Sequence, residues 1–215
     1  PSLHLDFESL LMLSEKQELE TRESYEASLD GAIEALKDTK GIVELKNQNV
    51  PTIVISDLHA RRDFLMNVLS QQDQDGQSVF DLLEKGKINV VCLGDGMHSE
   101  NRENWKVFDP NPAKGEGFME LNPQKMEKEM IASLGLMKMV MELKANFPES
   151  FHYVRGNHDD IGETITKFMK YVPEEVGGES GIVKWWTEKY FGKDFLDKWV
   201  KFEGMLPLVV QGKGF

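Results

Sequence analysis

The chain has 215 residues, 40% of them hydrophobic, which is enough for one large domain with its own core. Its formal net charge of -12 argues against binding to a nucleic-acid duplex or to an anionic membrane through bulk electrostatics. A phosphorylated substrate is compatible with this charge, because bound cations reverse the local field.

Cysteine content and the first residues indicate where the protein works. The single cysteine, Cys92, allows neither an intramolecular disulfide nor a cysteine-rich zinc site, which favours a reducing compartment and a cytoplasmic location. Residues 1–13 carry acidic side chains and no basic n-region, so they are not typical of a signal peptide. No apolar run approaches the roughly 20 residues that a membrane helix needs, so we expect no membrane partner.

Residues 1–45 are predicted to be an N-terminal helical extension to a domain that covers residues 46–215. Apolar residues recur at helical spacing through residues 5–40, and Ser14-Glu15-Lys16-Gln17 fits a capping box. We expect an amphipathic segment packed on the flank of the domain, with a partner-binding helix as the alternative. A short strand is predicted over Ile42–Leu45.

The next segment follows the order strand, helix, strand. The β-branched run Ile53-Val54-Ile55 predicts a buried strand, and Arg61–Gln71 has apolar residues at helical spacing. A further short helix is predicted over Val79–Glu84, before a second apolar strand over Val90–Leu93. This order is typical of a parallel crossover.

Residues 101–124 are predicted to be a long loop inserted near the strand ends, because prolines and glycines punctuate them. A lid or binding loop and a plain surface excursion are both compatible with this pattern. Residues 124–146 are predicted to be a helix that begins after Pro123 and ends before Pro148. Its methionines recur at helical spacing, and we expect them in the core rather than in a binding groove: Met126, Met130, Met137 and Met141.

The helix leads into a third apolar strand, Phe151–Val154, which completes a second crossover. Residues 161–200 are predicted to form helices on either side of a break at Gly177-Gly178. Another strand is predicted over Leu206–Val210.

Each of the three apolar strands ends in residues of the kinds that bind metals. Asp57 and His59 follow the first strand, Asp95 follows the second, and Asn157 follows the third. Open α/β sheets place ligands at the carboxyl ends of their strands. Carboxylate, imidazole and amide donors suit hard or borderline divalent ions, and a carboxylate such as Asp95 can bridge two ions roughly 3.5–4 Å apart. The sequence therefore predicts one metal site assembled from three strand ends.

Three motifs together resemble the calcineurin-like metallophosphoesterase superfamily in order and spacing: Asp57-x-His59, Gly94-Asp95 and Gly156-Asn157-His158-Asp159. The third motif is most similar to the phosphoprotein (serine/threonine) phosphatase branch, where the segment reads Arg-Gly-Asn-His-Glu. The resemblance covers about residues 50–212. It implies an α/β fold, a four-layer α/β/β/α metallophosphatase-like β-sandwich flanked by helices, of which this chain would hold the N-terminal part.

The resemblance also implies a phosphoester hydrolase that uses two divalent ions, with manganese, iron and zinc all fitting the ligand set. A hydroxide that bridges the metals would attack phosphorus in line. Asp57 and His59 would hold the first ion, Asp95 would bridge, and Asn157 would bind the second. The substrate would be a phosphorylated protein or a small phosphoester, and nothing in the sequence indicates the oligomeric state.

Two catalytic roles are implied as well. His158 would protonate the leaving alkoxide rather than bind metal, since an imidazole titrates near neutrality. Arg155 would approach the phosphate or brace the site, since guanidinium matches phosphate geometry.

The second motif departs from the family branch, which continues with Asp-Arg-Gly where this chain has His98-Ser99-Glu100. His98 therefore stands where an aspartate would orient His158, and the arginine that would clamp the phosphate is absent. Candidates for supporting the site or binding phosphate are His98, Asp159, Arg61, Arg62 and Arg102.

In the family, further metal-binding histidines and another arginine come from strands beyond Phe215, so we expect this chain to be part of a longer protein. Three functions are open. The first is a dinuclear-metal phosphatase, with protein substrates included. The second is a metallophosphatase-like binding or regulatory module that has lost turnover. The third is a nucleotide or dinucleotide polyphosphate hydrolase, in which aromatic residues between Trp105 and Phe118 would stack a base.

Overall fold

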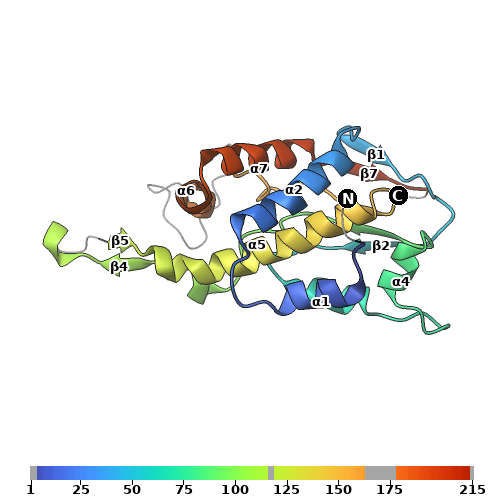
Figure 1. The fold of residues 1–215 in the computed structure, drawn as a ribbon, viewed down its shortest axis with the longest axis horizontal. Helices are drawn as coiled ribbons and strands as arrows, with labels where there is room; N and C mark the ends of the chain where they lie inside the picture. The colour runs from blue at the N-terminus through green and yellow to red at the C-terminus, as the bar shows by residue number, and fades with distance from the viewer. Residues whose placement is uncertain (1–3, 116–118, 163–177, 214–215) are drawn as a thin grey trace.

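A computed structural model of the chain describes residues 4–115, 119–162 and 178–213. A parallel sheet of three strands positions the candidate site (Figure 1). In spatial order these strands are β2 (Thr52–Ile55), β3 (Asn89–Cys92) and β6 (Phe151–Tyr153). Ile55, Cys92 and Tyr153 stand in register at the carboxyl ends. The segments that follow the three strands therefore leave the sheet at the same edge.

Helices connect the three strands, as the sequence predicts. Between β2 and β3 lie α3 (Arg62–Leu69) and α4 (Val79–Glu84), and between β3 and β6 lies α5 (Pro123–Asn146). The N-cap of α5 is Asn122, whose side chain accepts two backbone N–H groups of the first turn. Proline at the first helical position and Pro148 beyond the last turn set its two ends.

The long helix α5 is the centre of the hydrophobic core. Figure 1 shows it along the long axis of the molecule, where α2 (Arg22–Leu36) crosses it and α1 (Phe7–Glu15) also packs against it. The methionines predicted as core are buried, which confirms that prediction: Met126, Met130, Met137 and Met141. Cys92 is also fully buried in the core.

The capping box predicted at Ser14 was wrong. The N-caps of the two N-terminal helices are Asp6 for α1 and Thr21 for α2. Ser14 lies in the last turn of α1, where its hydroxyl donates to a backbone carbonyl of the same helix. The capping box that does form is in α4, between Ser78 and Asp81.

The C-terminal elements are α6 (Gly178–Phe191), α7 (Lys193–Met205) and β7 (Val209–Gln211). α7 packs against α2, and β7 pairs in parallel with β1 (Ile42–Glu44) to form a separate two-stranded sheet. The helices of this region break at Gly192, which has a φ of +88° and was not predicted. The part of the helix prediction on residues 163–177 falls outside the described residues.

The segment over residues 101–124, expected to be a loop, contains a small antiparallel hairpin. Its elements are η1 (Arg102–Trp105), β4 (Phe108–Pro110), η2 (Pro112–Lys114) and β5 (Met119–Leu121). Phe108 pairs with Leu121, and the hairpin extends beyond the N-terminal end of α5 (Figure 1). The two strands were not predicted because each has only three residues, too few to show an alternating pattern among the surrounding prolines and glycines. Phe118 lies outside the described residues.

Sheets flanked by helices confirm the predicted α/β fold class. Within the described ranges, no helix combines the length and the apolar character that crossing a bilayer requires.

Candidate metal centre

The loops after β2 and β3 run side by side and hold each other through backbone hydrogen bonds. The N–H groups of Leu58, His59 and Ala60 donate to the carbonyls of successive residues 94, 95 and 96, over 3.1, 2.6 and 2.8 Å. The pairing of the two strands thus continues past their ends. As a result, the residues that follow the two strands are fixed relative to each other by the main chain.

The loops after β3 and β6 touch through two glycines. A Cβ added at Gly94 would lie 2.4 Å from the Gly156 nitrogen, and one added at Gly156 would lie 2.2 Å from Asp95 Oδ1. Gly94 also has a φ of +97°, which L side chains rarely adopt. Glycine is required at both positions because only a bare backbone allows the two loops to approach this closely.

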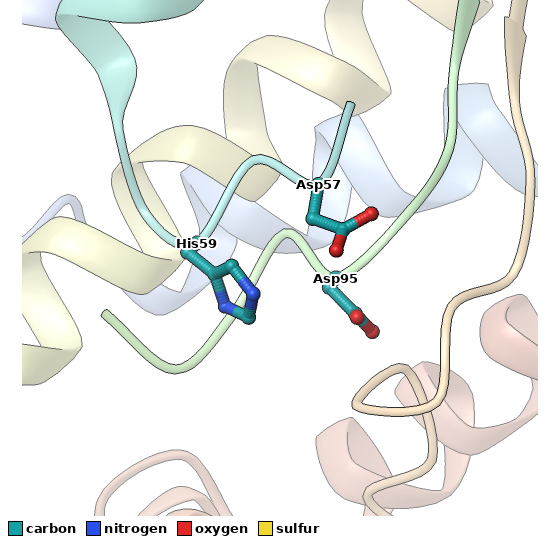
Figure 2. Close-up of side chains that lie close together, drawn as sticks. All are labelled: Asp57, His59 and Asp95. Carbon is teal, nitrogen blue, oxygen red and sulfur yellow. The ribbon is translucent and has the colours of Figure 1, made fainter. Parts of the chain in front are cut away.

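Asp57, His59 and Asp95 converge at this edge of the sheet, two from the loop after β2 and one from the loop after β3 (Figure 2). One donor atom from each side chain lies within 4.8 Å of the others. Ligand bonds of roughly 2.0–2.4 Å put donor atoms on one ion up to about 4–4.8 Å apart, so the three side chains fit around a single cation. No second group of His, Cys, Asp and Glu side chains in the described part of the chain meets this spacing.

The orientation of the His59 ring is set by a backbone carbonyl. His59 Nδ1 lies 3.0 Å from the carbonyl oxygen of His98. A carbonyl only accepts hydrogen bonds, so Nδ1 carries the proton and the lone pair of the neutral ring is on Nε2. Metal-binding histidines are commonly held by this kind of second hydrogen bond. The donor set is therefore one imidazole nitrogen and two carboxylates, which suits a divalent transition metal.

Backbone strain is concentrated around these side chains. Four non-glycine residues of the described chain have a positive φ, and all lie in the two loops: His59 (43°), Ala60 (57°), Asp95 (51°) and His98 (62°). Each such residue costs about 1–3 kcal/mol and persists only where its surroundings impose it. Strain of this kind is typical of functional sites. Here it fixes the direction of His59 and Asp95, two members of the triad Asp57, His59 and Asp95.

A buried carboxylate, Asp159, joins the loop after β3 to the loop after β6, on which it lies. It accepts the N–H groups of Asp95 and Gly156 at 2.9 and 2.8 Å, and the hydroxyl of Tyr153 at 2.9 Å. The same hydroxyl accepts the N–H of Gly96 at 2.6 Å. Burial raises the pKa of Asp159 to about 6, against the effect of these hydrogen bonds. Asp159 therefore supports the site from the interior.

The three side chains open into a pocket of about 270 Å³. Residues from the loops after β2, β3 and β6 line it, together with one residue of η1 and one of α6. They are Asp57, His59, Asp95, His98, Ser99, Glu100, Trp105, Asn157, His158 and Glu179. Four of these are carboxylates, and none of the described residues lining the pocket is a lysine or an arginine. Its chemical character suits cations, and a phosphate would enter it only together with them.

His158 is buried beside the triad. Its backbone N–H donates to Asp95 Oδ1 at 2.7 Å, and its ring centroid lies 5.5 Å from that of His59 and 5.1 Å from that of His98. Burial lowers the pKa of His158, while the charge of Asp95 opposes this shift. His98 stacks on Trp105 with ring centroids 5.8 Å apart, and burial lowers its pKa to about 3.

The predicted arginines do not reach the pocket among the described residues. Arg155 donates from Nε to the Asp159 carbonyl at 2.9 Å and pairs with Asp160 at 3.3 Å. Arg61 donates to the backbone carbonyls of its own loop, and its guanidinium lies over the ring of Phe64.

The two remaining arginines also lie outside the pocket lining. Arg62 donates to the carbonyls of Leu13 and Lys16, which links the end of α1 to the start of α3. Arg102 is exposed in η1.

Sequence reasoning missed a second buried carboxylate, Glu129 of α5. It accepts hydrogen bonds from Ser99, Asn104 and Ser133 and has no exposed surface. One signal was present in the sequence: Glu129 lies one turn after Met126, on the side of the helix that the methionines predict to be buried. A charged residue there is rarely buried unless it has partners. Three other lining residues had no assigned role: Trp105 was expected near the site only in the nucleotide-stacking alternative, Glu100 stands in the second motif, and Glu179 belongs to no motif.

Comparison with known proteins agrees with a metal site at the ends of these strands. A family model described as calcineurin-like phosphoesterase matches residues 50–212. Among solved structures, the fold is similar to that of a protein serine/threonine phosphatase from Saccharomyces cerevisiae with similarity to human phosphatase PP5, with a TM-score of 0.57 and 14% identity. That match covers 96% of this chain and 51% of the yeast chain, so this chain spans about half the length of the yeast protein. A comparison with curated proteins finds no match.

Proposed function

Because this chain belongs to the calcineurin-like phosphoesterase family, we propose that it carries the first part of the active site of a metal-dependent phosphatase. One observation carries this proposal. Asp57, His59 and Asp95 bring their donor atoms within 4.8 Å of one another at the carboxyl ends of two parallel strands. Asn157 and His158, from the end of the third strand, line the same pocket.

We propose the metal-binding roles that the family resemblance implies, and this arrangement supports them. Asp57 and His59 would hold one divalent ion, since both come from the loop after β2 and the His59 lone pair is on Nε2. Asp95, from the neighbouring loop, would be shared between two ions, and Asn157 would contribute to the second. Manganese, iron and zinc all accept such nitrogen and oxygen donors.

When bound, these ions would supply a nucleophilic hydroxide at neutral pH and offset the charge of the phosphoryl oxygens. His158 would give a proton from its ring to the leaving oxygen. Its position suits that role, because the hydrogen bond from its backbone to Asp95 holds the ring at the metal site. Burial lowers its pKa and so makes the charged ring a stronger acid. Arg155 would brace the third loop rather than clamp the phosphate, since its guanidinium is engaged with Asp159 and Asp160.

A phosphorylated protein and a small phosphoester are both substrates that this site would accept. A catalytically impaired binding module is the second candidate. One observation favours it: the described residues around the pocket include four carboxylates and no arginine that could bind the phosphate. A nucleotide-stacking role receives less support, because the indole of Trp105 is stacked on His98 and is almost fully buried.

The test is hydrolysis of p-nitrophenyl phosphate by this chain and by any longer form of the protein, with Mn²⁺ added or with metal removed by chelation. We expect turnover that depends on Mn²⁺ in at least one form and that is lost in Asp95→Asn. The matched control, Asp75→Asn, changes an exposed aspartate in the loop before α4 and should keep full activity. Metal binding without turnover in any form would favour the binding module, and the absence of both would refute the proposal.

A further inference from the structure

The loop that carries Asp95 and His98 is held in a strained conformation, and the structure shows what holds it. Asp95 and His98 both have a positive φ. The carbonyl of His98 is the group that accepts the Nδ1 proton of His59. The direction of this one carbonyl therefore decides which nitrogen of His59 faces the site.

Glu129 fixes the backbone on both sides of that carbonyl. Its Oε1 accepts the N–H of Ser99 at 2.8 Å and the hydroxyl of Ser133 at 2.8 Å. The Ser133 hydroxyl oxygen in turn accepts the N–H of His98 at 3.2 Å. The N–H groups of two successive residues are thus anchored, one directly and one through a serine, to a single carboxylate on α5.

Further contacts complete this anchor. Glu129 Oε2 accepts the Ser99 hydroxyl and, at 3.3 Å, the side-chain amide of Asn104. The indole N–H of Trp105 donates to the Ser99 carbonyl at 2.8 Å, and the indole stacks on the His98 ring. The carboxylate is therefore fully satisfied by neutral donors from the loop and from its own helix.

Packing alone does not account for a carboxylate at this position. Glu129 has 0% exposure, and both Met126, one turn earlier on the helix, and Met130, the next residue, are equally buried. A buried charge is costly, and an apolar side chain of similar volume commonly gives equal or greater stability. What an apolar side chain would not supply is a set of acceptors for the loop.

We propose that Glu129 is a positioning residue for His59. Through Ser99 and Ser133 it holds the His98 carbonyl against His59 Nδ1, which keeps the Nε2 lone pair directed at the metal site. This inference rests on the proposed function, because it takes His59 as a metal ligand. The family motifs give no role to Glu129. Its partner Ser99 stands where the family branch has the arginine of Asp-Arg-Gly.

The test reads the His59 tautomer directly, by nitrogen NMR of the ring in the metal-free chain. In the wild-type chain His59 is expected to be in the Nδ1–H form. Glu129→Ala should give a mixture of both tautomers, and Glu129→Gln, which keeps one acceptor oxygen, should retain more of the Nδ1–H form. Glu127→Ala is the matched control, since Glu127 is an exposed glutamate two residues earlier on the same helix, and it should leave the tautomer unchanged.

A second variant keeps the test decisive if Glu129→Ala does not fold. Ser133→Ala removes the acceptor of the His98 N–H and one donor to Glu129 while it keeps the Ser99 contacts of Glu129, and it should also shift the tautomer. Metal affinity provides an independent readout: Co²⁺ should bind about 10–100-fold more weakly to Glu129→Ala than to wild type. If His59 remains fully in the Nδ1–H form in a folded Glu129→Ala or Ser133→Ala chain, the proposal is overturned. A wild-type chain that binds no Co²⁺ would count against the proposed function, while the tautomer still decides the role of Glu129.

Discussion

Replacing Gly94 by alanine should strongly destabilise this protein, because the added methyl group would overlap the neighbouring loop. The new Cβ would lie 2.4 Å from the Gly156 nitrogen, 2.6 Å from the Val154 carbonyl oxygen and 2.7 Å from the Gly156 Cα. All three are backbone atoms, which cannot rotate away as a side chain would. The two loops would have to separate, and the proposed metal ligands would move with them.

The magnitude follows from two effects. A left-handed φ costs an L residue roughly 1–2 kcal/mol, and Gly94 has a φ of +97°. Overpacking in a closely packed interior typically costs about 1–3 kcal/mol. Because the overlap is with three backbone atoms of the neighbouring loop, we expect the combined loss to lie at the upper end, about 4–5 kcal/mol. This is a large part of the roughly 5–15 kcal/mol that stabilises a folded domain.

Two control variants separate these effects. Gly86 has a φ of +63° and no heavy atom within 4 Å of an added Cβ, so Gly86→Ala should cost only the backbone strain. Gly41 has open space and no positive φ, so Gly41→Ala should stabilise the fold, by about 0.4–1 kcal/mol, rather than destabilise it. Unfolding in urea, followed by circular dichroism, measures all three. If Gly94→Ala proved no less stable than Gly86→Ala, the close approach of the two loops would be wrong.

Three further changes test the surroundings of the site. Asp95→Asn should leave the chain folded but reduce its content of bound divalent metal, as measured by elemental analysis after dialysis; unchanged metal content would contradict the assignment. Tyr153→Phe should lower the free energy of unfolding by about 1–3 kcal/mol, because the N–H of Gly96 loses its closest acceptor and Asp159 loses a donor; a change below about 0.5 kcal/mol in urea unfolding would show that the hydroxyl is dispensable. Burial raises the pKa of Glu203 from its usual 4.5 to about 8, so its protonated form stabilises the fold fully at low pH, and this stabilisation is lost as the pH rises through 8. Glu203→Gln should therefore flatten the decline in the urea midpoint between about pH 5 and 8, and an unchanged decline would refute the cause.

The elements that carry the site could be predicted because their signals are local. β2 and β3 are short apolar runs with β-branched residues, and α5 has proline at its first position and methionines at helical spacing. The order of the motifs then placed Asp57, His59 and Asp95 at one edge. Their actual convergence depends on the close contact between Gly94 and Gly156, which both stand in the motifs but which the sequence does not show to touch.

Long-range partners could not be predicted in the same way. Glu129 serves a loop residue 30 positions earlier, Ser99, and no local pattern connects them. The pattern Ser14-x-x-Gln17 fits a capping box, which is why one was predicted there. The box that forms joins Ser78 to Asp81, which has a similar spacing. Ser14 lies in the last turn of α1, whereas Ser78 begins α4, and the local pattern does not distinguish the two positions. The pairing of β1 with β7 joins strands near opposite ends of the chain and is equally invisible to local reasoning.

The most direct test of the central claim is calorimetric titration of Mn²⁺ into the wild-type chain and into Asp57→Asn. The account predicts that wild type binds Mn²⁺ and that Asp57→Asn binds it at least 10-fold more weakly, while Asp75→Asn in an exposed loop binds it as wild type does. Equal affinity in all three chains would place the metal elsewhere and contradict a site formed by Asp57, His59 and Asp95.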